Sequence, residues 1–120
     1  MLSLSSSQRY YLSRQAADMR KSYDGLSGLV RQGMGRDPLS GEVFIFMNRR
    51  RTMMKVLVWD RIGFVLWSKR LERGTFELPA GQGQGSSICL GWDELVLIVE
   101  GVSLESVRRR KRYSPLQAEE

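Results

Sequence analysis

The sequence predicts a single small α+β domain, in which an antiparallel β-meander of three to five strands packs against about two helices. Three runs rich in β-branched and aromatic residues, at 43–47, 54–59 and 64–69, are separated by short polar connections, as expected for consecutive strands. Apolar residues recur at helical spacing within 18–33, and a second apolar stretch at 92–100 is bounded by helix caps. A chain of 120 residues can bury one hydrophobic core but not two.

The first helix is predicted at 18–33 from one apolar stripe, formed by Met19, Tyr23, Leu26 and Val30. Asp18 suits the N-cap, because its carboxylate can accept hydrogen bonds from the free amides of the first turn. Gly33 and Gly35 can end the helix. Two glycines inside the span weaken this helix by about 1 kcal/mol each relative to alanine.

The remaining connections follow from turn residues. A short aromatic stretch at 9–12 is predicted to be a strand, and 36–41 a tight turn, because Pro38 fixes one φ angle and Gly41 accepts a positive one. The segment 60–63 is predicted to be a hairpin turn. The connection at 48–52 places Arg49, Arg50 and Arg51 side by side at a loop tip.

The C-terminal third is less regular. A Gly/Gln/Ser segment at 80–87 is predicted to be a flexible loop, and 87–90 a short edge strand. Gly91 and Gly101 favour a helix at 92–100, although its apolar core at 95–99 equally suits a strand. The predicted domain covers 1–114, with 1–7 frayed, a possible helical arm at 103–112 and a tail at 115–120.

Positive charge is concentrated in two parts of the chain. The net charge is +6, yet eight basic and two acidic residues lie within 49–73, whereas 74–107 holds five acids and no base. Clustered arginines repel one another unless phosphates neutralise them, so these clusters indicate nucleic-acid contact. A solvated surface or an acidic protein partner is the alternative. The candidate nucleic-acid-binding residues are Arg49, Arg50, Arg51, Lys69, Arg70, Arg73, Arg108, Arg109, Arg110, Lys111 and Arg112.

Composition argues against an enzyme. The chain has no histidine, so a Ser-His or Cys-His pair cannot form, and a zinc site would lack its common ligands. Four of the aspartates each have a better use as a cap or turn residue, namely Asp18, Asp37, Asp60 and Asp93. We therefore expect no catalytic residue, metal or cofactor. The single cysteine, Cys89, is expected to be an inert core thiol, and one cysteine with no long apolar run indicates a cytoplasmic protein without a membrane span.

Aromatic residues are abundant on the predicted strands. They could stack on the bases of single-stranded nucleic acid, but core packing is the more common use; they are Phe44, Phe46, Trp59, Phe64 and Trp67. The runs at 43–47 and 64–67 are apolar on both faces, and two short helices can hardly cover both sides of a sheet. Some apolar surface is therefore expected to meet a partner or a second copy of the chain.

Several motifs, in one order, resemble the TnpB accessory proteins of the IS-sixty-six family of bacterial insertion sequences. They lie at 10–12, 18–26, 35–41, 43–46, 48–52, 55–60, 63–64, 69–76, 92–95 and 100–101, so the similarity extends over almost the whole chain. The sequence differs at Gly91, where the family more often has a hydroxyl N-cap, and in the Gly-Gln repeat after Pro79. RNA-guided nucleases that share the name TnpB are far longer and carry catalytic acids and zinc-binding cysteines.

The resemblance implies a small protein that is encoded beside a separate DDE transposase and is needed for efficient transposition. No catalytic residues are transferred with it. Our first hypothesis is a non-catalytic accessory protein that contacts DNA, at element ends or without sequence preference, and assists the transposase. The alternative is a protein-binding adaptor or oligomerisation module that touches only the transposase or the other accessory protein of the element.

Overall fold

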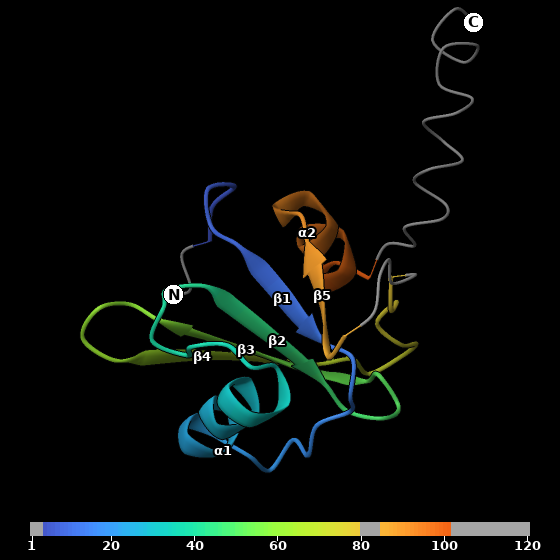
Figure 1. Cartoon of the computed structure of the whole chain (residues 1–120). Coiled ribbons are helices and arrows are strands. Elements are labelled where there is room, and N and C mark those ends of the chain that lie inside the picture. Colours follow the sequence, from blue (N-terminus) through green and yellow to red (C-terminus); the bar gives the residue numbers. More distant parts are fainter. Residues whose placement is uncertain (1–3, 80–84, 102–120) are drawn as a thin grey trace, which may run out of the picture.

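A computed structural model describes residues 4–79 and 85–101 of the chain, and Figure 1 shows its sheet with one helix on each face. The five strands lie in the order β4-β3-β2-β1-β5. Along the chain the elements are β1 (Tyr10–Ser13), α1 (Tyr23–Gly28), the π-helical turn η1 (Leu29–Gly33), β2 (Val43–Met47), β3 (Met53–Trp59), β4 (Phe64–Arg70), β5 (Ser87–Leu90) and α2 (Trp92–Val99). The predicted α+β class is confirmed.

The sheet is mostly antiparallel, with one parallel pair. Strands β2, β3 and β4 form the predicted meander, in which Val43 lies opposite Val58 and Val58 opposite Val65. Strand β1 pairs in parallel with β2, so that Tyr11 lies beside Phe44. Parallel neighbours need a long crossover connection, and the segment containing α1 and η1 supplies it. Strand β5 then closes the other edge, antiparallel to β1.

The sheet separates two apolar layers. On one face, Leu26 and Val30 of α1 and η1 pack over a group of buried side chains formed by Tyr11, Ala17, Met34, Phe44, Phe46 and Leu57. On the other face, Leu95 and Ile98 of α2 cover the larger group, formed by Tyr10, Leu12, Val43, Ile45, Met47, Met54, Val56, Val58, Phe76, Ile88 and Leu90. Each short helix therefore covers most of one face. Coverage ends at β4, whose residues 64–67 are only half-buried.

The predicted helix start at Asp18 is wrong. The Asp18 carboxylate accepts hydrogen bonds from the backbone amide and the guanidinium of Arg20, which form a local turn instead of a helix cap. The guanidinium of Arg20 also holds the pKa of Asp18 well below its usual range. The α-helix begins only at Tyr23, and from Leu29 it widens into a π-helical turn. It ends at Gly33, as predicted.

The second predicted helix and the short edge strand are confirmed. The backbone amide of Gly91 donates a hydrogen bond of 3.0 Å to the carboxylate of Glu94 in the first turn of α2, and Gly101, at a φ of 78°, follows the helix end. The expectation that Cys89 is a core thiol is wrong, because its side chain is exposed. Cys89 lies on edge strand β5, whose residues alternate between buried and accessible, and Ile88 and Leu90 occupy the buried positions.

Two predicted turns are confirmed by their hydrogen bonds. The Asp60 carboxylate accepts from the backbone amides of Ile62 and Gly63 at the β3–β4 hairpin, where Arg61 adopts a φ of 89°. At 36–41, Asp37 accepts from the amide of Leu39. The predicted loop at 80–87 falls mainly outside the described residues, as do the arm at 103–112 and the tail at 115–120. No described helix is long and apolar enough to cross a bilayer.

Phe76 anchors the irregular segment 71–79 to the sheet. Its side chain is fully buried in the layer beneath α2, although Phe76 itself belongs to no helix or strand. Its backbone amide donates a 2.7 Å hydrogen bond to the carbonyl of Arg51, and Leu71 donates similarly to Thr52. These contacts hold the segment against the connection between β2 and β3.

We predict that Phe76→Ala lowers the free energy of unfolding by about 3–5 kcal/mol, because it leaves a cavity in a closed apolar layer. Urea denaturation followed by tryptophan fluorescence measures the change. Thr75→Ala, at the exposed neighbouring position, is the control and should stay within about 0.5 kcal/mol of the unchanged chain. Equal stability of the two variants would contradict the anchoring role of Phe76.

Candidate nucleic-acid interface

One end of the sheet collects basic side chains from separate parts of the sequence. At this end β1, β2 and β4 finish and β3 and β5 begin, as their pairing registers require. We call it the basic end. Its seven basic residues are Arg14, Arg49, Arg50, Arg51, Lys69, Arg70 and Arg73, and the acidic residues in the same segments are Glu72 and Glu77.

The β2–β3 connection at 48–52, here called the arginine turn, is held by Asn48. The Asn48 side-chain oxygen accepts hydrogen bonds from the backbone amides of Thr52 and Met53, at 2.9 and 3.0 Å, and its amide group donates to the Thr52 hydroxyl. These bonds close the turn from within and leave its arginine side chains unused. Arg49, Arg50 and Arg51 are consequently all exposed.

Arg51 has a left-handed backbone conformation, with a φ of 58°. Such a conformation costs a residue with a side chain about 1 kcal/mol or more, and glycine adopts it freely. Two hydrogen bonds stabilise it: the Arg51 amide donates to the carbonyl of Asn48 at 3.0 Å, and the Arg51 carbonyl accepts from Phe76. The arginine turn therefore holds Arg51 in a strained backbone conformation.

Lys69, Arg70 and Arg73 lie at the same end of the sheet, but each makes different contacts. The ammonium of Lys69 donates a 2.8 Å hydrogen bond to the carbonyl of Val99, so it binds the C-terminal end of α2. Arg70 lies 3.4 Å from Glu72 in an exposed ion pair, which contributes little to stability. Arg73 is exposed. In the sequence it lies between Leu71 and Phe76, whose backbone amides donate hydrogen bonds to the arginine turn.

Arg14 is a member of the basic end that sequence reasoning missed. It follows β1, and its backbone amide donates to the carbonyl of Ser86, while the nearby Ala17 donates to Met47. The Ala17 bond holds the segment after β1 beside the end of β2, and the Arg14 bond joins it to the residue before β5. Only the parallel pairing of β1 with β2 places Arg14 near the arginine turn, and no local sequence signal indicates that pairing.

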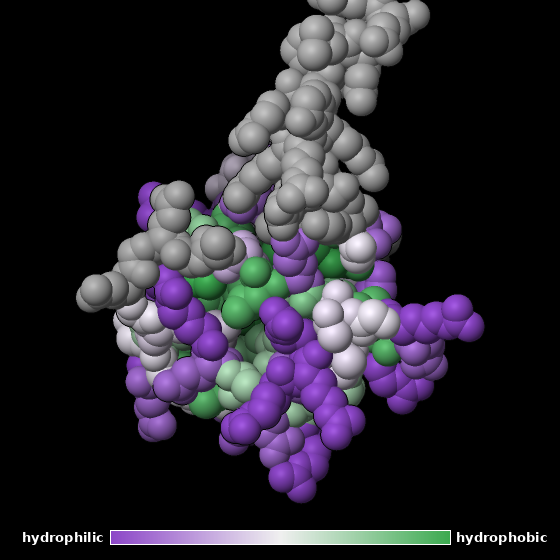
Figure 2. Space-filling model, turned by 90° about the vertical axis from the view of Figure 1, so that its right-hand side faces the viewer, coloured by the Kyte–Doolittle hydropathy of each residue, from purple (hydrophilic) through white to green (hydrophobic). Residues whose placement is uncertain are grey.

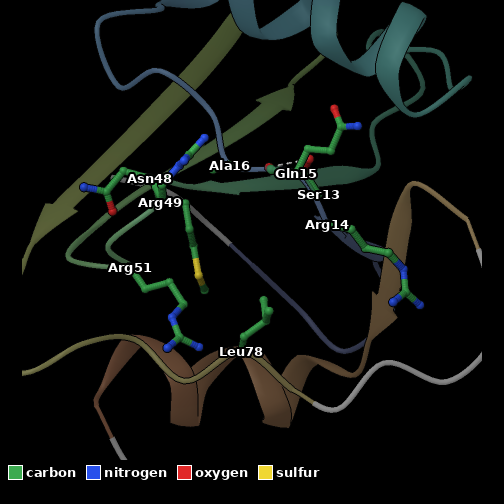
Figure 3. Close-up of a pocket in the computed structure, with 9 residues that line it drawn as sticks. Ser13, Arg14, Gln15, Ala16, Asn48, Arg49, Arg51 and Leu78 are labelled. Carbon is green, nitrogen blue, oxygen red and sulfur yellow. Dashed lines mark hydrogen bonds between the residues drawn. The ribbon is translucent and has the colours of Figure 1, made fainter.

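A cavity of about 260 Å³ opens at the basic end, between the segment after β1 and the arginine turn. Figure 2 looks onto this end of the molecule and shows hydrophilic side chains gathered around a hollow with hydrophobic atoms inside it. In Figure 3, Arg14 and Arg51 lie on opposite sides of the cavity, and Leu78 lies between them. The arrangement suits an anionic ligand that also carries apolar surface.

The second predicted cluster, Arg108–Arg112, lies outside the described residues and stays a prediction. Within 4–79 and 85–101, no group of three cysteine, aspartate or glutamate side chains could hold a metal ion. In the same ranges, the aromatic residues Phe44 and Phe46 are fully buried and cannot stack on bases, whereas Trp59, Phe64 and Trp67 are half-buried.

Comparison with known proteins agrees with the motifs. The family model described as IS66 Orf2 like protein matches residues 8–109, a span that includes every helix and strand described above. The uncharacterized protein y4jC of Sinorhizobium fredii (strain NBRC 101917 / NGR234) is 29% identical over 115 residues, which cover 96% of this chain and 97% of the relative. The uncharacterized protein y4hO of the same strain is 29% identical over 102 residues, covering 85% and 87%.

No solved structure matches the chain significantly. The family model covers well over half of the chain and agrees with the motifs at 35–41, 48–52 and 69–76. The chain therefore belongs to the IS66 Orf2-like family, the accessory proteins of insertion-sequence transposition.

Proposed function

We propose that the chain assists transposition without catalysing it, by binding DNA at the basic end of its sheet and presenting that DNA to the transposase. The observation that carries the proposal is the convergence of seven basic side chains from three separate segments on one end of the sheet, with two acidic residues among them. Such a cluster repels itself unless phosphate groups neutralise it.

The expected contacts are to the DNA backbone. Among the described residues, no ion pair engages the three arginines of the arginine turn, so their guanidinium groups are available for bidentate contact with phosphates. The long helix or ribbon that would read bases in the major groove is missing from the described part of this end. We therefore expect binding to element ends and to other duplexes to differ little unless the transposase is present.

We predict salt-steep binding that depends on the arginine turn. With about five phosphate contacts, log Kd plotted against log salt concentration should change with a slope of about 4 to 5. The variant Arg49→Ala/Arg50→Ala/Arg51→Ala should reduce that slope by about 2 to 3, because each lost contact removes about 0.9. Fluorescence anisotropy with labelled element-end and scrambled duplexes over a salt series measures both values.

The matched control is Arg9→Ala/Arg31→Ala/Arg61→Ala, which removes the same charge from exposed positions away from the basic end. This control should keep most of the slope, because long-range attraction alone is screened beyond about 10 Å at 0.1 M salt. An affinity that does not change between low and moderate salt, or equal losses in the two triple variants, would refute DNA binding by the basic end.

A second function, a protein-binding adaptor, is favoured by a different surface. A cavity of about 450 Å³ lies between α2 and the strands β3 and β4, and its lining is mainly apolar. Val96 and Trp92 on α2 are 39% and 42% exposed, and Trp67 on the adjacent edge strand is half-buried. This surface could receive the transposase, the other accessory protein of the element or a second copy of the chain.

The adaptor function predicts that Val96→Asp reduces co-purification with the transposase after nuclease treatment, because a charge would then have to be buried at the contact. Gln32→Glu adds the same charge at an exposed position of η1, on the opposite face, and should leave co-purification unchanged. Circular dichroism checks that both variants remain folded. Loss of the complex on nuclease treatment of the unchanged chain would count against direct protein contact.

A further inference from the structure

The cavity at the basic end combines positive charge with apolar surface. Of the residues that line it, Arg14, Arg49 and Arg51 carry guanidinium groups, Met47 and Leu78 offer apolar contact, and none is acidic. A site for inorganic phosphate alone would not need the apolar part. A site for an apolar ligand would not need arginines, because the exposed guanidinium groups of Arg49 and Arg51 would lose hydration on covering.

The size of the cavity limits the ligand further. Its volume of about 260 Å³ falls below the range of about 300–1,000 Å³ that is typical of sites for drug-sized ligands. One nucleobase with an adjacent phosphate is a ligand of this scale and of this mixed character.

The backbone conformation of Arg51 does not depend on its side chain. Glycine would adopt a φ of 58° without strain, and the hydrogen bonds that hold the turn use the backbone of Arg51 and the side chain of Asn48. The fold therefore has no need of the Arg51 guanidinium. Figure 3 shows this group beside Leu78, at the edge of the cavity.

We propose that the cavity binds one unstacked nucleotide of DNA, with its base on Met47 and Leu78 and its phosphates contacted by Arg14 and Arg51. This inference rests on the DNA contact proposed above and adds a preference to it. A duplex with a single-stranded overhang or an extrahelical base offers such a nucleotide at little cost, whereas a blunt, fully paired duplex must first unstack one. The protein should thus recognise opened or frayed DNA.

The test compares two duplexes of one sequence, one blunt and one with a short 3′ overhang that carries 2-aminopurine. We expect the overhang duplex to bind about tenfold more tightly, since stacking on one base and one charge-assisted contact together account for at least that factor. The fluorescence of 2-aminopurine should rise as its base leaves the stack. Equal affinities would overturn the nucleotide site and leave general DNA binding intact, whereas no binding of either duplex would overturn both.

Two arginines with the same backbone strain provide a matched pair of variants. Arg51→Gly and Arg61→Gly each remove one charge and relieve one left-handed conformation, but Arg61 lies at the β3–β4 hairpin, at the other end of the sheet. Both variants should melt at or above the temperature of the unchanged chain. Only Arg51→Gly should lose the overhang preference, and equal behaviour of the two variants would overturn the proposal.

A third variant separates the shape of the cavity from its charge. Leu78 is 40% exposed, so Leu78→Trp can fill the opening without disturbing the core and without changing the charge. It should abolish the overhang preference and keep the affinity and salt slope for the blunt duplex. Retained preference in Leu78→Trp would overturn the site. Competition by free deoxyadenosine monophosphate at micromolar concentration would also overturn it, because the ligand would then be a free nucleotide and not DNA.

Discussion

Every side chain of β2 is buried, and this burial constrains the rest of the molecule. A central strand that is apolar on both sides requires cover on both faces of the sheet, which α1 and α2 provide (Figure 1). No charged side chain is buried in the described part of the chain. Charged side chains therefore reach the surface, and six of the eleven described arginines lie at one end of the sheet.

The local parts of the fold could be predicted from the sequence. Strands and the hairpin are determined by residues that are close together in the sequence. These are the apolar runs at 43–47 and 64–69 and the turn residues around Asp60. The start of α1 was misplaced because the Asp18 carboxylate bonds the amide of Arg20, and a side chain that can cap a helix can equally stabilise an isolated turn. The parallel pairing of β1 with β2 and the exposure of Cys89 depend on non-local contacts, which no short window of sequence contains.

The same distinction applies to the candidate site. Clustering along the chain indicated the arginine turn, because three consecutive arginines are visible without a structure. Arg14 joins them only through strand register, and Lys69 faces α2 because its position in β4 alternates with Arg70. The cavity and the strained backbone of Arg51 are properties of tertiary structure, so composition and charge could indicate an anionic partner but not the form in which it is bound.

The position of β1 links the two ends of the chain during folding. Strand β5 pairs only with β1 among the described strands, so it is attached to the rest of the sheet through β1. The hairpins of β2, β3 and β4 form from neighbours in sequence and can arise early, whereas β1 and β5 must close long loops. Detachment of β1 would release β5 with it, so amide hydrogens at both ends of the domain should exchange in a single cooperative opening, separate from the meander.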